Sequence, residues 1–489
     1  MLYRSSKIRV SVGARVDITG AAMNNPDTDE LRAALHGLAQ HKNPKHAQLT
    51  RLRIRFNERA EPRVVDMSRP IKGGGISLPC GLLDGALAVL SQHGHPTTPV
   101  YLRVEGVDVP EREHLLTLRP FQVDIMATIE ANPVALVRAP PGSGKTTVGL
   151  AAFAALRQRT LVIVPRTSLL EQWKERCVAE LGMNPKEVGI IQGSKRTIGD
   201  ITIASQQTLA NCVGDYTNTF GVVMGDEAQT FAASTFIAVI DRLHSNHRIG
   251  FTADERRSDG KDFLVRWLFG KPRIEVKRDF LEDEKLLEDV QVVVVPYTRP
   301  APDWWGGLSA DQRNSPEVQR LVTDYITTDQ DRTALVVRIV EREAKRGNAT
   351  LALSHRVEHC HTMQQMLAQA GMGAGLLLGG AENKQEYNYT RDAIREGRQR
   401  AAIGTYQAVG VGVDLPSLSV GVCATPCANY RNSRFQWNQY RGRFARVSPG
   451  KLKAVMFYIW DEALFGDKPV GYLTDWNRNV TFENHKMGD

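Results

Sequence analysis

Two adjacent carboxylates follow a short apolar run in this sequence. The stretch VVMGDEAQTF, residues 222–231, passes directly from small and apolar residues to Asp226 and Glu227. Two like charges side by side are costly unless a positive group faces them. A magnesium nucleotide would supply that charge, whereas a helix N-terminus would favour an acidic pair through its dipole alone. Catalysis and helix capping are therefore the two interpretations of this pair.

A glycine-rich segment upstream favours catalysis. RAPPGSGKTT, residues 138–147, lies between a predicted strand and a predicted helix over 146–156, the context that a phosphate-binding loop requires. Its glycines let backbone N–H groups approach phosphates, and the helix N-terminus adds its dipole. Lys145 is expected to bind the β- and γ-phosphates of ATP, and the Thr146 hydroxyl to ligate Mg²⁺. The predicted ATP-binding residues of this loop are Pro141, Gly142, Ser143, Gly144, Lys145, Thr146 and Thr147.

A magnesium nucleotide bound at this loop would bring a cation to the acidic pair. Asp226 is expected to hold Mg²⁺ through water, so that Thr146 and Asp226 are the predicted metal-binding residues. Glu227 is the predicted base that orients the attacking water. Helix capping would explain the acidic pair only if the match of residues 138–147 to a phosphate-binding loop were also a coincidence.

The elements that must position these groups form two series of short apolar strands. VALVRAP, TLVIVP, ITIAS, GVVMGDE and RIGFTAD alternate with amphipathic helical stretches, as in an α/β domain with a parallel sheet. A second series begins near residue 349 with ATLALSH, GLLLGG, AAIGTY, SVGVCAT and AVMFYIW. We predict an N-terminal α+β accessory domain over residues 1–112, a first α/β domain over 113–280, a connecting segment over 281–345, a second α/β domain over 346–465 and a tail over 466–489.

The accessory domain contains an alternating segment. In LTRLRIRF, residues 49–56, apolar residues alternate with Arg51, Arg53 and Arg55, which predicts a strand with one arginine face. Such a row could follow a phosphate backbone. A solubilising outer face explains it equally well.

The composition indicates what kind of partner and which cellular compartment to expect. The 489 residues carry a net charge of +8, which weakly favours a polyanionic partner. Six cysteines are too few for a disulfide scaffold, so we expect a reducing compartment, with Cys423 and Cys427 as buried thiols. No apolar run is long enough for a membrane span, and the N-terminus has no signal-peptide pattern. These features predict the cytoplasm of a bacterium or of a phage-infected cell.

Taken together, the motifs resemble those of superfamily 2 helicases, in the same order over about 113–460. LRPFQ resembles the adenine-reading motif, which implies that Gln122 and Arg119 bind ATP. VPRTSLLEQW, ASQQTL and FTADERRSDG resemble motifs of the first motor, and GDEAQ adds Gln229 to the implied catalytic residues. The resemblance implies that these motifs contact nucleic acid through Arg166, Thr167, Gln206 and Thr252.

The second motor is implied by three further motifs. LALSHRVEHC resembles the fourth motif, GTYQAVGVGVDLP the fifth and QYRGRFAR the sixth. The resemblance implies nucleic-acid contacts by His355, Arg356 and Thr405, and nucleotide contacts by Gly412 and Asp414. It also implies that Arg443 and Arg446 are catalytic arginine fingers.

This sequence departs from the family pattern at two positions. It has Asp254 where the third motif has a hydroxyl residue, and Gln229 where the DEAH-related branch has histidine. The glutamine amide both donates and accepts, so it can still bridge to the other motor, but it cannot titrate. LRPFQ, LLEQW and LFGKP are most similar to the DEAH-related branch, which includes phage recombination helicases and excision-repair helicases.

The resemblance implies two tandem RecA-like motor domains that use ATP and Mg²⁺. The implied function is an ATP-dependent DNA helicase or translocase, in DNA repair or recombination, acting as a monomer on forked, branched or duplex DNA. An RNA helicase and the motor subunit of a restriction or defence complex are the alternatives, together with a nucleotide-gated clamp. A metal site at His355, His359, Cys360 and His361, and a base-stacking wedge at Trp304 and Trp305, are weaker hypotheses than a polar turn and hinge packing.

Overall fold

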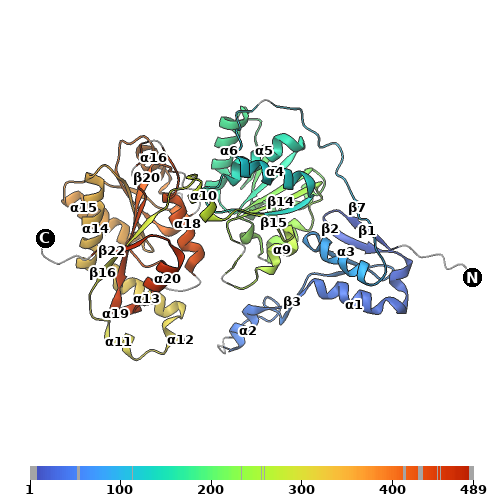
Figure 1. Cartoon of the computed structure of the whole chain (residues 1–489), viewed down its shortest axis with the longest axis horizontal. Helices are drawn as coiled ribbons and strands as arrows, with labels where there is room; N and C mark the ends of the chain where they lie inside the picture. Colours follow the sequence, from blue (N-terminus) through green and yellow to red (C-terminus); the bar gives the residue numbers. More distant parts are fainter. Residues whose placement is uncertain are drawn as a thin grey trace, which may run out of the picture. The chain divides into compact units, whose positions relative to one another are not determined.

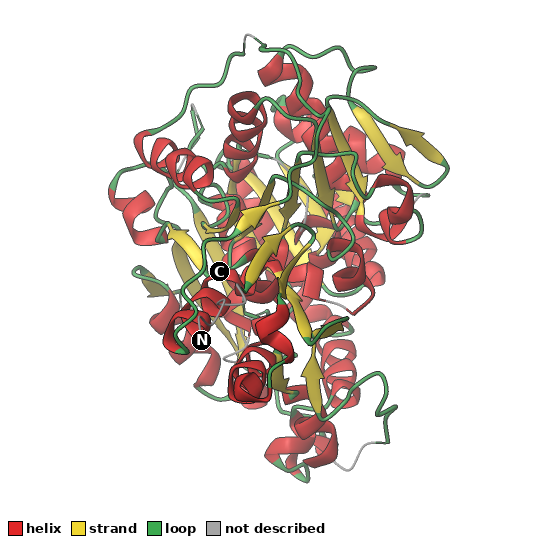
Figure 2. Cartoon of the chain, turned by 90° about the vertical axis from the view of Figure 1, so that its right-hand side faces the viewer, coloured by secondary structure: helices red, strands yellow, loops and turns green. Residues whose placement is uncertain are grey.

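The computed structural model describes residues 8–51, 55–112, 114–232, 234–254, 256–257, 259–380, 382–410, 415–427, 433–448, 450–451 and 453–483. The chain forms two compact units, one of residues 1–140 and 144–277 and one of residues 141–143 and 278–489. Figure 1 labels their elements, and Figure 2 distinguishes their helices from their strands. The predicted boundary near residue 112 therefore separates two sheets within one unit.

The N-terminal sheet has the strand order β5-β6-β2-β1-β7 and is mainly antiparallel. Apolar residues of the sheet and of two helices, among them Val16, Leu35 and Leu90, are fully buried between them. These elements are β1 (Arg9–Val12), β2 (Arg15–Thr19), α1 (Asp29–Leu38), β5 (Arg69–Ile71), β6 (Gly75–Pro79), α3 (Leu83–Gln92) and β7 (Val100–Tyr101).

A smaller two-stranded extension interrupts this domain. β3 (Gln40–Lys42) pairs with β4 (Val64–Asp66), and α2 (Pro44–Arg51) lies between them in sequence. We call residues 40–66 the basic arm, since they include seven lysines and arginines against three acidic residues. No residue of α2 is buried.

The predicted arginine-faced strand is wrong. Residues 49–51 end helix α2, and Arg55 lies beyond the helix outside any strand. Asn43 Oδ1 caps the helix by accepting the N–H groups of Lys45 (3.1 Å) and His46 (3.4 Å), and Pro44 occupies its first position. The cap at Asn43 and the proline at the first helical position favour a helix more strongly than the short alternation of arginines favours a strand. Arg53 lies outside the described residues.

The domain predicted as the first motor, a name kept below for its sheet and helices, has an eight-stranded sheet of order β11-β10-β12-β9-β13-β14-β8-β15, parallel except at the β10–β11 pair. All five predicted strands are present, and β9, β12 and β13 are buried along their whole length, as expected for a sheet covered on both faces. The strands are β8 (Val134–Arg138), β9 (Thr160–Val164), β10 (Gly189–Gln192), β11 (Lys195–Thr197), β12 (Ile201–Ser205), β13 (Val222–Asp226), β14 (His247–Thr252) and β15 (Pro272–Glu275). The helices are α4 (Pro120–Ala131), α5 (Lys145–Leu156), α6 (Thr167–Leu181), α7 (Gln206–Ala210), α8 (Ser234–Ile240) and α9 (Phe263–Phe269).

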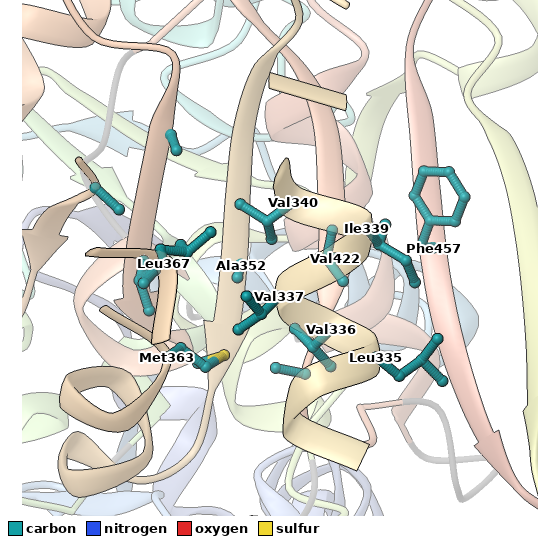
Figure 3. Packing of buried hydrophobic residues seen from close by; sticks show 14 of the residues in the cluster. Leu335, Val336, Val337, Ile339, Val340, Ala352, Met363, Leu367, Val422 and Phe457 are labelled. Atoms are coloured by element: carbon teal, nitrogen blue, oxygen red, sulfur yellow. The ribbon is translucent and has the colours of Figure 1, made fainter. Parts of the chain in front are cut away.

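The second motor is a seven-stranded parallel sheet of order β18-β19-β17-β20-β21-β16-β22. Figure 3 shows apolar side chains of α14 over this sheet, with Met363 and Leu367 of α15 beside them. Its strands are β16 (Gln291–Tyr297), β17 (Ala349–Ser354), β18 (Gly375–Leu377), β19 (Ala401–Thr405), β20 (Leu418–Cys423), β21 (Val455–Asp461) and β22 (Val480–Phe482). The helices of this unit are α10 (Arg278–Asp283), α11 (Asp303–Gly306), α12 (Ala310–Arg313), α13 (Pro316–Thr327), α14 (Gln330–Lys345), α15 (Val357–Gln369), α16 (Lys384–Arg395), α17 (Tyr406–Gly410), α18 (Arg434–Phe444), α19 (Glu462–Phe465) and α20 (Lys468–Trp476).

Two predicted boundaries of this domain are wrong. Strand β16, expected within a connecting segment, pairs with β21 from Gln291↔Val455 to Tyr297↔Asp461, and α14 packs on the same sheet. Strand β22, expected in a tail, pairs with the other edge of β16. Sequence patterns miss such strands because their partners are remote in the chain.

The cysteines lie as expected. Cys423 and Cys427 are buried free thiols with their sulfurs 3.5 Å apart. Among the helices that the structure describes, none combines the length and apolar character needed to cross a membrane.

Candidate nucleotide and nucleic-acid sites

The phosphate-binding loop connects the end of β8 to the start of α5. Gly142 and Gly144 have φ of 87° and 83°, a left-handed conformation that favours glycine. The Lys145 ammonium donates to the carbonyls of Ala139 (3.0 Å) and Pro140 (3.3 Å). The lysine is thus held along the inner side of the loop, where a phosphate would replace the carbonyls as its partner.

Gln122 lies against this loop. Its Oε1 accepts the Arg119 N–H at 2.9 Å at the start of α4, and its side chain is buried. A Cβ added to Gly144 would come within 2.4 Å of Gln122 Nε2. The glutamine from LRPFQ therefore lies against the loop, whereas Arg119 is exposed at the helix start, and their adenine-reading role stays a prediction.

Asp226 is a buried carboxylate at the end of β13. Burial is the main cause that raises its pKa, and the charge of Glu227 raises it further. The Trp173 indole donates to Asp226 Oδ2 at 2.9 Å, and this bond and the charge of Lys145 act in the opposite direction. A cation would relieve the same cost, so the site suits a metal bound with a nucleotide.

Glu227 adopts a left-handed backbone with φ of 55°, which is strained for a glutamate. Gln229 Nε2 donates to Glu227 Oε2 at 2.6 Å, and the Thr252 hydroxyl donates to Gln229 Oε1 at 2.6 Å. The glutamine therefore uses both ends of its amide within the first motor. Its predicted bridge to the second motor stays a prediction.

The predicted nucleic-acid contact of Thr252 stays a prediction, and in this structure the residue binds within the first motor. Its side chain is fully buried, and its hydroxyl also lies 2.6 Å from the Asp254 carbonyl. It thus links β14 to the acidic pair. Asp254, the departure from the motif, holds the turn instead, since it accepts from the backbone N–H and guanidinium of Arg256.

The residues present fit Mg²⁺–ATP. The loop has two left-handed glycines and a lysine, Thr146 is the second residue of α5, and the Asp226 carboxylate is buried with Glu227 beside it. Thr147 is different, because its hydroxyl accepts from Arg176 of α6 at 2.6 Å and so joins two helices.

Three predicted nucleic-acid contacts of the first motor follow neighbouring strands. Arg166 and Thr167 follow β9 and begin α6, and Gln206 follows β12 and begins α7. β9 and β12 pair directly, with Val164 opposite Ser205, so these three residues lie at one edge of the sheet. Arg166 and Thr167 are exposed, and Thr167 accepts from Gln192 at 2.9 Å.

The second motor presents a groove beside its fourth motif. The groove has a volume of about 430 Å³, and its walls include His355 and Arg356 with Arg320 of α13 and Gln436 of α18. Arg356 forms an ion pair with Asp324 at 2.7 Å. Thr405 is mostly buried and caps α17 by accepting the Ala408 N–H at 3.2 Å.

Helix α18 carries the sixth motif. Arg443 is half-buried near the C-terminus of α18. Arg446 follows the helix, and its backbone pairs with that of Leu287 in an isolated antiparallel β-bridge. Arg441, to which sequence reasoning gave no role, is buried and bonds Glu282 at 3.0 Å and Asp289 at 3.3 Å. Burial lowers its pKa to about 10, aided by Arg278 and opposed by these two carboxylates. Gly412 and Asp414 lie outside the described residues.

Sequence reasoning missed two residues of the first motor. Trp173 was only part of the LLEQW signature, and Arg257 was only part of a charged loop, although it donates to the Gln229 carbonyl. A tryptophan on an amphipathic helix looks like ordinary core, so only its contact with Asp226 reveals its role.

The weaker hypotheses gain no support. His359 bonds Ser354 at 3.0 Å and Thr333 at 3.1 Å, and burial, with the nearby Arg332 charge, lowers its pKa to about 4. The described residues contain no group of ligands arranged for a metal. Trp305 is buried against Phe465 within the second unit, and Trp304 is 39% exposed.

Sequence comparisons agree with this geometry. Residues 115–256 match the sequence model of the family described as type III restriction enzyme, res subunit. A protein of Kineococcus radiotolerans named DNA 3'-5' helicase XPB is 25% identical over 344 residues, which are 68% of this chain and 59% of that protein. A protein of Escherichia phage T5 named as a probable helicase is 24% identical over 333 residues, 67% of this chain and 68% of that protein.

A solved structure of Dbp5 from S. cerevisiae, bound to RNA and ADP BeF3, has the same fold. It matches with a TM-score of 0.55 at 13% identity, over 75% of this chain and 89% of that one. The chain spans 59% of the length of this XPB relative. Residues 115–256 therefore form a ResIII helicase-family domain, and in its motifs, its two parallel sheets and these relatives the chain is similar to superfamily 2 helicases.

Proposed function

We propose that this protein is an ATP-dependent DNA helicase or translocase. The observation that carries the proposal is the buried connection from the acidic pair through Gln229 to Thr252, beside a complete phosphate-binding loop. Relatives named DNA 3'-5' helicase and a phage helicase support DNA as the polymer.

The chain's own groups divide the work of hydrolysis. Lys145 turns from the Ala139 and Pro140 carbonyls to the phosphates. Mg²⁺, held by Thr146 and through water by Asp226, would neutralise phosphate charge. Glu227 orients the attacking water and accepts its proton, and the bond from Gln229 fixes that carboxylate.

The remaining site residues have proposed roles that follow the family. Gln122 and Arg119 read adenine, and Gly412 and Asp414 lie near the nucleotide. Arg443 and Arg446 act as arginine fingers, for which a guanidinium fork suits phosphate better than lysine does. The nucleic-acid backbone is gripped by Arg166, Thr167, Gln206, His355, Arg356 and Thr405, and the arm arginines Arg51, Arg53 and Arg55 bind duplex phosphates.

The proposed substrate is forked, branched or duplex DNA, acted on by a monomer in the cytoplasm of a bacterium or phage-infected cell. Bacterial and phage relatives support that setting. A second candidate, the motor subunit of a restriction or defence complex, is favoured by the family description of residues 115–256.

The test is steady-state ATP hydrolysis without polymer and with single-stranded, duplex and forked DNA or RNA. We expect forked or duplex DNA to give the strongest stimulation and Lys145→Ala to lose about 100-fold or more in kcat. The strongest stimulation by RNA would overturn the DNA assignment. A Lys145-dependent rate that no polymer changes would instead favour a subunit that needs its complex.

A further inference from the structure

A second path of polar contacts leads away from the acidic pair. The Gln229 carbonyl accepts a hydrogen bond from the Arg257 guanidinium. Arg257 forms a two-fold pair with Asp259, at 2.9 Å and 2.8 Å, and its backbone N–H donates to Asp262 at 2.5 Å. Asp259 also accepts the backbone N–H of Lys261 at 3.1 Å. The loop after β14 is therefore held by ion pairs and hydrogen bonds among its own residues, and Arg257 attaches it to the backbone carbonyl of Gln229.

The far end of this loop is attached to the basic arm. Lys261 Nζ and Glu61 Oε2 are 2.6 Å apart, and both side chains are mostly buried, at 13% and 15% exposed. Just after Lys261, the ring of Phe263 stacks on His41 of the arm, with centroids 3.9 Å apart and an angle of 17°. A mostly buried ion pair beside a stacked ring contact holds the two segments together more firmly than an exposed ion pair would.

Glu61 is also the residue that holds the arm helix. It pairs with Lys45 at 2.9 Å and accepts from Asn43 Nδ2 at 3.1 Å, and Asn43 is the cap of α2. Burial alone would raise the pKa of Glu61, but the hydrogen bonds from Lys261, Lys45 and Asn43 outweigh it and lower the pKa to about 2. The carboxylate is thus ionised throughout the neutral range.

The outer side of the arm suits a polyanion. Its described exposed cations come from the helix, the following turn and both strand ends, and they are Lys42, Arg51, Arg55, Arg59 and Arg63. Glu61 and the half-buried Lys45 lie on the inner side with the loop. A phosphate backbone could therefore bind the outer cations without displacing the inner pair.

We propose that the Lys261–Glu61 pair couples the basic arm to the catalytic acidic pair, so that nucleic acid bound by the arm raises the rate of ATP hydrolysis. The proposal rests on the proposed function and names the element through which the polymer acts. Arg257, Lys261 and Glu61 are positioning residues, because they reach Glu227 only through Gln229.

Coupling between two binding sites is reciprocal. If nucleic acid at the arm changes the catalytic pair, nucleotide at the catalytic pair must change the arm. The arm can therefore be tested in two ways, and the second needs no nucleic acid.

The first test compares hydrolysis rates of the full chain with saturating forked DNA. Lys261→Ala and Glu61→Gln are expected to reduce the DNA-stimulated kcat about fivefold or more, with basal kcat and DNA affinity changed less than about twofold. Lys261→Arg should retain stimulation. The matched control is Arg273→Ala, which removes another ion pair of the same unit, Arg273–Asp84 at 2.6 Å between β15 and α3, and should behave as the wild type.

The second test measures hydrogen exchange of residues 40–66 with and without ADP·BeF3. We expect nucleotide to change exchange in the wild type and in Arg273→Ala but not in Lys261→Ala. Equal responses in Lys261→Ala and wild type, or no response in the wild type, would overturn the coupling. If no polymer stimulates the wild type, the proposed function fails, and the exchange experiment still decides the coupling.

Discussion

At the residue scale, the carboxylates of Asp226 and Glu227 are held in place by hydrogen bonds from neighbouring side chains. Asp226 is held by the Trp173 indole, and Glu227 by the Gln229 amide. Glu227 also keeps a left-handed backbone, a strain that the surrounding bonds must offset. A hydroxyl from the next strand completes the arrangement, since Thr252 binds the other end of the amide.

The bond between Thr252 and Gln229 can be removed with little change in shape. Thr252→Val is expected to lower kcat about tenfold with little change in the KM for ATP, because the amide that orients Glu227 loses its anchor. It should also cost about 1–3 kcal/mol of stability, since Gln229 Oε1 would be buried without that donor.

A matched threonine separates the two effects. Thr160 is equally buried in the same sheet, but its hydroxyl donates only to the Gln158 carbonyl at 2.8 Å, at the start of β9. Thr160→Val should lose stability in urea denaturation while steady-state kcat stays near the wild-type value. Similar losses of kcat in both variants would contradict a specific role for Thr252.

At the element scale, the strands and the nucleotide loop could be predicted from sequence, because each buried strand is a short apolar run closed by a polar turn. The same approach failed for the arm, where three alternating arginines concealed the helix start at Asn43 and Pro44. It also failed for β16 and β22, whose sheet partners are remote in sequence. The contacts of Trp173 and Arg257 could not be predicted, because spacing along one element says nothing about the element packed against it.

The arm's attachment should show a defined pH dependence. The pKa of Glu61 is about 2 in the folded protein and near 4.5 when unpaired, so its bonds stabilise the fold fully above pH 4.5. That contribution is lost as the pH falls from 4.5 towards 2. The difference in urea midpoint between wild type and Glu61→Gln should therefore be constant from pH 5 to 7 and shrink below pH 4.5. A difference that grew with acid would show that Glu61 is not paired in solution.

At the scale of the whole molecule, the accessory domain and the first motor share one compact unit. The buried Arg15 guanidinium pairs with Asp241 of the motor, and the side chain of Asn246 bonds both backbone groups of Val104, at 2.8 Å and 3.2 Å. The packing is closest at Gly81, where an added Cβ would lie 2.1 Å from the Arg266 carbonyl of α9.

Two glycines near this interface should respond in opposite directions. Gly81→Ala is expected to cost about 2 kcal/mol or more, because the backbone of α9 cannot yield to a methyl group. Gly85→Ala, in the first turn of α3 with its nearest neighbour a Leu38 methyl at 3.5 Å, should gain up to about 1 kcal/mol in helix propensity. Thermal unfolding measures both. Equal melting temperatures for the two variants would contradict the close packing.

The shared core also bears on whether another domain could stand in place of the N-terminal one. Val65, Met67 and Leu82 of the accessory domain pack against the same apolar cluster as Trp267 and Phe269 of the motor. A motor expressed from residue 113 onward would expose that patch to water and should aggregate. An unrelated domain put in place of the N-terminal domain would therefore leave this apolar cluster of the motor uncovered, unless the two surfaces were changed together.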